Sequence, residues 1–540
     1  MSAVDLNPEP IAAESLLPPW WTRAEEKLDR AGDWLNPILV KEARQAMKSK
    51  QFSITFALLL LLGWFWTALF VVMSIPAVYY APYGSAVLMG YFVLLTIPLL
   101  IVVPYQAFRS LAAEREDGTY ELLSITSLSA RQIVLGKLGS AILQMIVYYS
   151  ALAPCIAFTY LLRGVDVVTI AHLLFYTFLA SVMLSIIGLM LATVTQARHW
   201  QLVLSVLLVI LLCIVTLFWN ISMLAWLDSP VPLPYSSWQF WVVQLVILSF
   251  YASYAALFLL LAAGQISFAS ENRSTPLRWV LFGQQVLLIG WVGFGMAVLG
   301  EWEIMYAAAT LSALHWIIVG VFLTAERGKL SPRALRALPQ SLLGRMFLTW
   351  FNPGGATGYV LSMTCLLGAF LCIAVTMITA SLYGVGGDPF EPEAWNFGLC
   401  IFGYSAAYLG LTHGVVSGLE RLGVRTSMLL SVLLQVLFVF LGCLIPFAFQ
   451  AAILSWDATR MEYSPLQVTN WMWTLSEVSD GKFNADRSIP LLVFGVGMVV
   501  YILHIALAAG EVEKQRAATP LRVREEDRAL GRDRPGMLEL

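Results

Sequence analysis

Charged residues are scarce in this sequence. Only 12% of its 540 residues are Asp, Glu, Lys or Arg, whereas 59% are hydrophobic, and soluble proteins carry roughly 25% charged residues. The mean hydropathy is +0.76. Such a chain cannot cover itself with polar surface, so a soluble globular fold is excluded and lipid must surround most of its length. The apolar runs are also too long for the strands of a membrane β-barrel.

Several motifs that carry chemistry are missing as well. Gly136-Lys137 is followed by Leu138 and has no upstream glycine in register, so no phosphate-binding loop of the GxxxxGK[ST] type occurs. ATP binding by such a loop is therefore excluded, and we find no nucleophile motif and no metal-ligand cluster. The cysteines form no Cys-x-x-Cys pair, which favours packing roles. They lie within apolar runs, at Cys155, Cys213, Cys365, Cys372, Cys400 and Cys443.

The apolar residues fall into about twelve runs near the length that crosses a bilayer. The sequence therefore predicts an all-α, polytopic membrane protein. The first run begins behind a long polar tail with many acidic residues, unlike a cleavable signal peptide, so we expect it to act as an uncleaved insertion signal. The expected spans are 54–77, 86–104, 136–162, 169–195, 201–224, 240–264, 279–299, 304–325, 358–383, 396–417, 427–449 and 489–509.

The positions of the basic residues predict the orientation. With twelve spans and the N-terminus inside, every Lys and Arg falls on the inside except Arg163, Arg460, Lys482 and Arg487. The outside loops are instead acidic, with Glu301, Glu303, Asp388, Glu391 and Glu393. This distribution follows the positive-inside rule. We therefore expect both termini in the cytoplasm.

The expected spans contain little that could carry a proton or an ion. We place no Asp, Glu, Lys or Arg deep inside a span, and this disfavours a secondary transporter, because such proteins usually rely on buried ionisable groups. His315 and His504 are the best membrane-embedded titratable candidates, although a lone histidine in a helix is more often a hydrogen-bonded packing residue. The largest outside loop, 450–488, contains three tryptophans that indicate an interfacial aromatic surface, namely Trp456, Trp471 and Trp473.

An amphipathic segment, Trp34 to Phe52, precedes the first span. Asn36 can cap a helix that has Pro37 at its first position. The spacing predicts an interfacial helix along the inner leaflet, and the alternative is an ordinary basic stop before a membrane helix. Its apolar face would carry Leu35, Ile38, Leu39, Ala43, Ala46 and Met47, and its polar face Lys41, Arg44, Gln45 and Lys48.

A second informative segment, 105–137, follows the second span. We expect the span to continue as a polar helix through Glu116 and to stop at Gly118, since glycine suits a left-handed helix end. A short helix with a small apolar face is expected over 119–124, and Ser129 with Gln132 is expected to form a capping box that opens the third span. Such an elbow below the membrane suits docking into a partner's groove, and the alternative is a well-ordered connector.

The run EREDGTYELLSITSLSARQIVLGK resembles the signature of ABC-2 type transporter permeases, and the amphipathic segment before it resembles the elbow helix of that family. The matching positions are Glu114, Glu116, Gly118, Thr119, Glu121, Leu122, Leu123, Gly136 and Lys137. The resemblance covers 34–265. It implies a six-helix permease domain whose loop between spans two and three contacts a separate ATP-binding cassette subunit. ATP and Mg²⁺ would be held by that subunit, so this chain is expected to hold no cofactor and to be no enzyme.

The resemblance implies four segments. These are a polar cytoplasmic tail (1–33), an ABC-2-like permease domain (34–265), a second six-span membrane domain that would be a degenerate permease (266–510), and a charged cytoplasmic tail (511–540). The second half departs from the family pattern, because the Glu-Asp-Gly-Thr segment is absent from it.

Two alignments of the halves are open. The first pairs Ala325-Glu326-Arg327 with Ala113-Glu114-Arg115, and Gly344-Arg345 with Gly136-Lys137. The second pairs Trp350-Phe351-Asn352-Pro353 with Trp34-Leu35-Asn36-Pro37. The two exclude each other. We prefer the first, because it also places the loop 450–488 between the fifth and sixth spans of its half.

The function that this resemblance implies is that of an exporter permease in a bacterial-type cytoplasmic (inner) membrane. Its expected partners are the ATP-binding cassette subunit, the lipid bilayer, and a second copy of the chain or a second permease subunit. No nucleic-acid partner is expected. The alternatives are a membrane scaffold derived from such a permease and, third, a secondary transporter.

Overall fold

The computed structural model describes residues 36–76, 80–116, 128–194, 197–227, 233–268, 271–299, 303–326, 348–383, 392–424, 426–454, 462–516, 525–526 and 529. Within these ranges every regular element is a helix, and twelve helices are long and apolar enough to cross a membrane. The predicted all-α, polytopic membrane fold is therefore confirmed, and each expected span overlaps one of the twelve.

The helices run in chain order as follows. In the first half they are α2 (Pro37–Met47), α3 (Lys50–Ser74), α4 (Gly84–Ile97), the π-helical turn η2 (Pro98–Val102), α5 (Val103–Glu116), α7 (Ala130–Leu161), α8 (Val167–Val194), α9 (Arg198–Leu227) and α10 (Trp238–Ile266). In the second half they are α11 (Ser274–Leu299), α12 (Glu303–Thr324), η3 (Thr349–Phe351), α15 (Gly355–Leu382), α16 (Pro392–Arg421), α17 (Met428–Ile453), η5 (Pro465–Thr469), α18 (Trp471–Ser479) and α19 (Ser488–Arg516).

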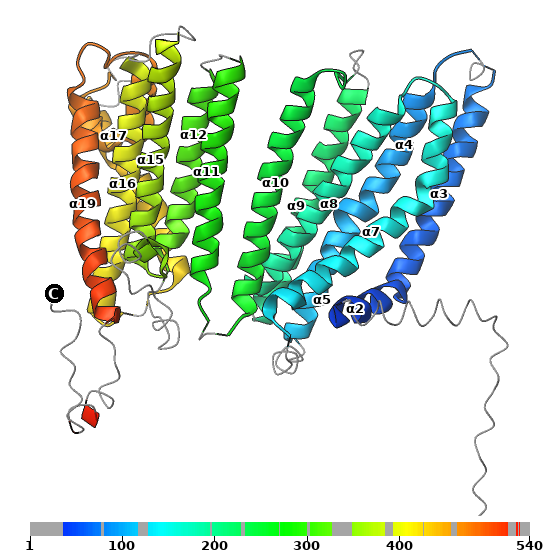
Figure 1. Ribbon diagram of the computed structural model, residues 1–540, viewed down its shortest axis with the longest axis horizontal. Coiled ribbons are helices and arrows are strands. Elements are labelled where there is room, and N and C mark those ends of the chain that lie inside the picture. The colour runs from blue at the N-terminus through cyan, green and yellow to red at the C-terminus, as the bar shows by residue number, and fades with distance from the viewer. Residues whose placement is uncertain are drawn as a thin grey trace, which may run out of the picture. The chain divides into compact units, whose positions relative to one another are not determined.

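The chain divides into two compact units. Unit 1 comprises Met1–Trp238 and Phe258–Ile266, and unit 2 comprises Gln239–Leu257 and Ser267–Leu540. In unit 1, α5 packs along α8, while α7 packs against α2, α3 and α4. Figure 1 shows that α2 runs across one end of unit 1, whereas the long helices of that unit run steeply away from it.

The second span of unit 1 is helical from Gly84 to Glu116 and contains a π-helical turn between α4 and α5. Pro98 opens this turn. A proline has no N–H to donate to the preceding turn, so it leaves a local irregularity in the helix. A hydrogen bond from α8 stabilises this turn, because the Ser181 hydroxyl donates to the Leu99 carbonyl. This stretch carries the chain beyond the apolar run to Glu116, as the sequence predicted.

In unit 2, α16 packs along α19 and α12 packs along α15. The segment 462–487 folds back onto α16 and α17. The hydroxyls of Tyr404 and Tyr408 donate to the carbonyls of Val468 and Thr469. Trp471 and Trp473 are half-buried in this packing, and their role as an interfacial aromatic surface stays a prediction. Trp456 lies outside the described residues.

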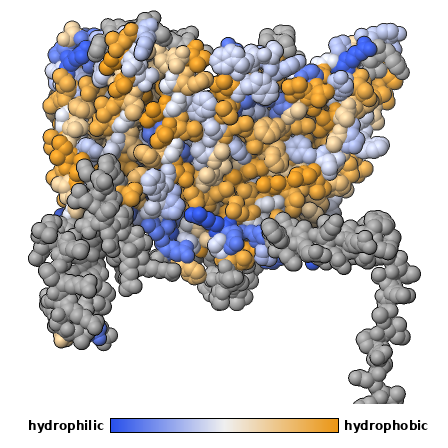
Figure 2. Space-filling view, viewed as in Figure 1, coloured by the Kyte–Doolittle hydropathy of each residue, from blue (hydrophilic) through white to orange (hydrophobic). Residues whose placement is uncertain are grey.

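The lateral surfaces of the helices are apolar. In the most hydrophobic stretch of α3 only 11% of the residues are buried, and the same holds for α17. Trp64 and Leu61 of α3 are 71% and 67% exposed. In the view of Figure 2, hydrophobic residues cover most of the flank, and hydrophilic residues gather near the helix ends. Apolar surface of this extent needs lipid around it, so the chain is a multi-pass membrane protein.

Candidate functional site

The helix before the first span, α2, begins as the sequence predicted. The Asn36 side chain accepts a hydrogen bond of 3.0 Å from the Ile38 backbone N–H, and Pro37 is the first helical residue. The Asn36 side-chain amide also donates to the Gln132 carbonyl, which lies in the first turn of α7. Asn36 therefore both starts α2 and attaches it to the third span of unit 1.

The apolar face of α2 lies on α7, and two glycines make this approach possible. A Cβ at Gly136 would lie 2.9 Å from both Cβ and Cγ2 of Ile38, and a Cβ at Gly139 would lie 2.8 Å from Leu39 Cδ1. A side chain at Gly136 would displace α2, because Ile38 Cβ is fixed to the backbone, whereas the Leu39 methyl beside Gly139 can shift. Gly136, which matches the resemblance found in the sequence, therefore lies at the contact between α7 and α2.

Lys137 is buried at the centre of this end of unit 1. Its side chain is 1% exposed, and Nζ lies 3.1 Å from Glu42 Oε1 on α2 and 3.1 Å from Glu114 Oε2 on α5. Nζ also donates to the Ser110 carbonyl at 3.1 Å. A buried ammonium needs such partners, because an uncompensated charge in a dry environment is costly. We call Lys137, Glu42 and Glu114 the ion triad; it joins three helices.

The cations predicted for the elbow helix face away from α7. Lys41, Arg44 and Lys48 are all exposed. Lys41 reaches back toward the ion triad, with Nζ 3.5 Å from Glu114 Oε1 and 3.8 Å from Glu42 Oε1. Met47, assigned to the apolar face from the sequence, is 38% exposed. The Glu42 carboxylate, by contrast, lies on the buried side of α2, where it pairs with the Lys137 ammonium.

The end of α5 is held on two sides. The Arg115 guanidinium donates to the Thr193 carbonyl at the end of α8, at 2.7 Å. Glu116, the last residue of α5, has a side chain that is 20% exposed and lies 3.9 Å from Arg109 Nη1 on the same helix. The predicted capping box of Ser129 and Gln132 is confirmed at the start of α7. The loop between these helices lies outside the described residues, and with it Gly118, Thr119, Glu121, Leu122 and Leu123.

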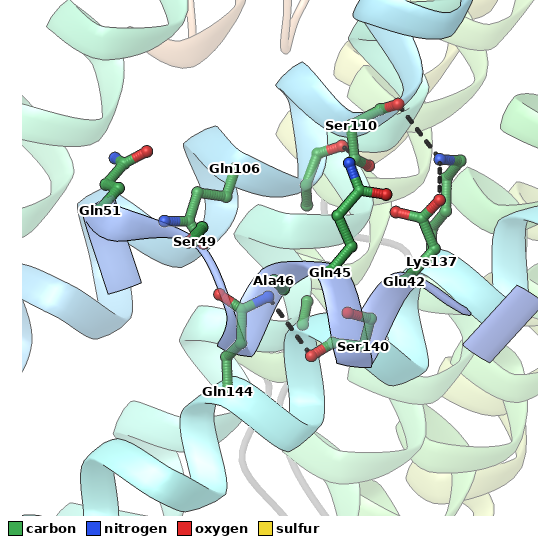
Figure 3. Close-up of a pocket in the computed structure, with 12 residues that line it drawn as sticks. Glu42, Gln45, Ala46, Ser49, Gln51, Gln106, Ser110, Lys137, Ser140 and Gln144 are labelled. Atoms are coloured by element: carbon green, nitrogen blue, oxygen red, sulfur yellow. Dashed lines mark hydrogen bonds and ion pairs between the residues drawn. The ribbon is translucent and has the colours of Figure 1, made fainter. Parts of the chain in front are cut away.

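Beside the ion triad lies a polar cavity of 180 Å³, lined by α2, α3, α5 and α7. Figure 3 shows Gln45, Gln106 and Gln144 around it, with Lys137, Glu42 and Ser110 at one side. The sequence analysis did not find this cavity. Its residues are spread from 42 to 144 along the chain, and no motif connects them.

Unit 2 contains a second buried cation, Arg278, in the second turn of α11. It is 0% exposed, and Nη2 lies 2.7 Å from Glu326 Oε2 just after α12. Further hydrogen bonds hold the segment from η3 to the start of α15, where Arg278 donates to the carbonyls of Trp350 (2.8 Å), Asn352 and Gly354 (3.0 Å). Arg278 therefore fixes the entrance to α15.

Neither buried cation contradicts the expectation that no charged residue lies deep inside a span. Arg278 stands just before the apolar run expected to begin at residue 279, yet α11 begins at Ser274. Lys137 lies in the second turn of α7. Both are near helix ends and both are paired with carboxylates. The two histidines singled out from the sequence are hydrogen-bonded, His315 to the Tyr254 hydroxyl (3.1 Å) and His504 to the Val500 carbonyl (2.8 Å).

Compared with known protein families, curated proteins and solved structures, the chain matches none of them.

Proposed function

We propose that this chain is the transmembrane permease subunit of an ABC-2 type exporter, driven by ATP hydrolysis in a separate nucleotide-binding subunit. In this proposal both termini are cytoplasmic, and the ends of α5 and α7 face the ATP-binding subunit. The support comes from the sequence resemblance over 34–265, from the twelve apolar helices, and from the ion triad.

The ion triad is the observation that carries the proposal. Two of its members flank the loop 117–127, the segment that resembles the family's coupling region, with Glu114 on α5 before the loop and Lys137 on α7 after it. Glu114 is two residues before the end of α5, and Lys137 is in the second turn of α7. Glu42 adds α2 to the same cluster. Because the charges are largely shielded from water, their mutual attraction is strong, and a displacement at the loop would move all three helices together.

Glu116 is the residue of this region best placed to meet a partner. It ends α5, and its contact with Arg109 at 3.9 Å is a surface pair, which contributes little to stability. Glu114 is 16% exposed and points to the ion triad instead. In this proposal Glu114 connects the three helices of the ion triad, and Glu116 contacts the ATP-binding subunit.

Unit 2 contains a feature that parallels the ion triad. Glu326 follows the second long helix of its half, and Glu114 lies in the last turn of the second span of the first half; both pair with a buried cation. By contrast, Asn36 caps α2, whereas Gly354 rather than Asn352 stands at the N-cap of α15. This supports the first alignment and a divergent second permease domain in unit 2.

The proposal is tested by purifying the chain from membranes that also contain the candidate ATP-binding subunit. The isolated chain is expected to hydrolyse no ATP, and the complex is expected to do so. Glu116→Lys should lower the stimulated hydrolysis at unchanged abundance, because charge reversal repels the complementary surface. Asp480→Lys, in the segment between α18 and α19, is the matched control and should have no effect.

Each alternative has its own outcome in this test. A scaffold would be retained with its partners but would leave ATP hydrolysis unchanged, and Glu116→Lys would be silent. A secondary transporter would move substrate in the absence of the ATP-binding subunit and would stop when the ion gradient is collapsed.

A further inference from the structure

The polar cavity beside the ion triad, which we call the elbow cavity, has the walls of a ligand site. It lies where α2 turns into α3, and each of its four helices contributes one glutamine, namely Gln45, Gln51, Gln106 and Gln144 (Figure 3). Its 180 Å³ has room for several waters, or for one small polyhydroxylated ring.

The charges at the cavity wall are already balanced. The Lys137 ammonium donates to Glu42 Oε1 and to the Ser110 carbonyl, each at 3.1 Å, and forms an ion pair of 3.1 Å with Glu114 Oε2. Two carboxylates therefore already neutralise this ammonium, and the Glu42 carboxylate on the cavity wall would repel a phosphate group. The ligand that fits the cavity is therefore electrically neutral.

The remaining wall is suited to hydroxyl groups. Gln144 is 4% exposed, its Oε1 has no hydrogen-bond partner, and its Nε2 makes only a long contact of 3.5 Å with the Ser140 carbonyl. A buried acceptor without a donor is costly, and a ligand hydroxyl would supply the donor. Small hydroxyl and methyl side chains complete the lining, and these match the hydroxyl edge and C–H face of a sugar; they are Ser49, Ser110, Ser140, Ala46, Ala107 and Ala141.

The position of the cavity points to a lipid rather than a free sugar. Gln51 lies in the first turn of α3, and Ile54 and Leu58 follow on the same side of that helix, 59% and 51% exposed. The cavity thus opens beside an uncovered apolar helix surface, at the end of the spans, where headgroups lie. A headgroup in the cavity would leave its acyl chains along α3.

We propose that the elbow cavity binds a membrane lipid with a neutral, hydroxyl-rich headgroup, of which a glycosyl diacylglycerol is the simplest example. This inference rests on the cavity and on the membrane fold, and it is independent of the transport proposed above.

The test uses the full-length chain in phosphatidylcholine nanodiscs doped with monoglucosyl diacylglycerol, phosphatidylglycerol or unmodified diacylglycerol. Lipid that stays bound on release from the disc is measured by native mass spectrometry. Gln144→Leu removes the unpartnered acceptor, and Ala141→Leu fills the cavity without touching a charge. Gln435→Leu replaces a buried glutamine of α17 in unit 2 and serves as the matched control.

The glucosyl lipid is expected to be retained over both other lipids. Gln144→Leu and Ala141→Leu should each lower its retention about tenfold, which corresponds to about 1.4 kcal/mol, and Gln435→Leu should not. Equal retention of all three lipids, or unchanged retention in both cavity variants, would mean that the cavity holds only water and would overturn the proposal. Competition by methyl glucoside at equal concentration would also overturn it, because the site would then recognise a free sugar.

Discussion

Neutralising only the two carboxylates of the ion triad should destabilise unit 1 more than neutralising all three of its charged groups. Lys137 is 1% exposed and holds two carboxylates, Glu42 and Glu114, each at 3.1 Å. Glu42→Gln or Glu114→Gln replaces one carboxylate beside the buried ammonium with a neutral amide, and each should cost no more than about 1.5–3 kcal/mol, the range for a hydrogen bond to a charged group. The double variant leaves a buried ammonium without a counter-charge, which costs about 3–5 kcal/mol.

Adding Lys137→Met to the double variant should restore most of the lost stability, because an uncharged cluster has no unpaired ion to bury. The measurement is the thermal midpoint, followed by tryptophan fluorescence in one detergent. Glu477→Gln serves as the control, since it breaks an ion pair of 2.9 Å with Lys482, whose side chain is 44% exposed, and such surface pairs contribute about 0–1 kcal/mol. A triple variant no more stable than the double variant would refute the reasoning.

Three further predictions concern packing, unit 2 and orientation. Gly136→Leu should lower the free energy of unfolding by about 1–3 kcal/mol, measured as a lower thermal midpoint, and should expose α2 to protease. Gly368→Leu should do neither, because nothing lies within 4 Å of a Cβ there. Glu326→Lys should sharply reduce membrane abundance, since it sets a second cation against a buried guanidinium; normal abundance would contradict the role given to that pair. In a cysteine-free variant, Asp480→Cys should react with an impermeant thiol reagent on intact cells and Ser331→Cys should not, and the reverse labelling would invert the proposed orientation.

The structure adds a stability ranking to the coupling ranking that the sequence favours. Read as a sequence, the segment after Glu326 lacks the coupling signature, so Glu326→Lys is expected to impair ATPase coupling less than Glu116→Lys. Arg278 predicts the opposite order for stability, because Glu326 is the counter-ion of a fully buried guanidinium whereas Glu116 makes only a surface contact. Coupling and stability therefore need separate readouts at these two sites.

Part of the candidate site was readable from local sequence. Asn36 and Pro37 predicted the start of α2, and Ser129 with Gln132 predicted the start of α7, because a helix cap depends on residues within four positions of each other. Lys137 and Glu114 were selected by resemblance. Glu42 was missed, since it sits among residues assigned to a helix that touches lipid, and nothing nearby shows that its partner lies 95 residues away.

The sequence by itself determined the class of this protein, the number of apolar helices and most of their positions. It could do so because burial of an apolar run in lipid depends on composition over some twenty consecutive residues. The tertiary structure decided where the charges go. Lys137, Arg278 and the elbow cavity are invisible to a hydropathy pattern, because a buried cation or a polar cavity is stabilised by groups from several helices, and only the packed fold brings those groups within hydrogen-bond distance.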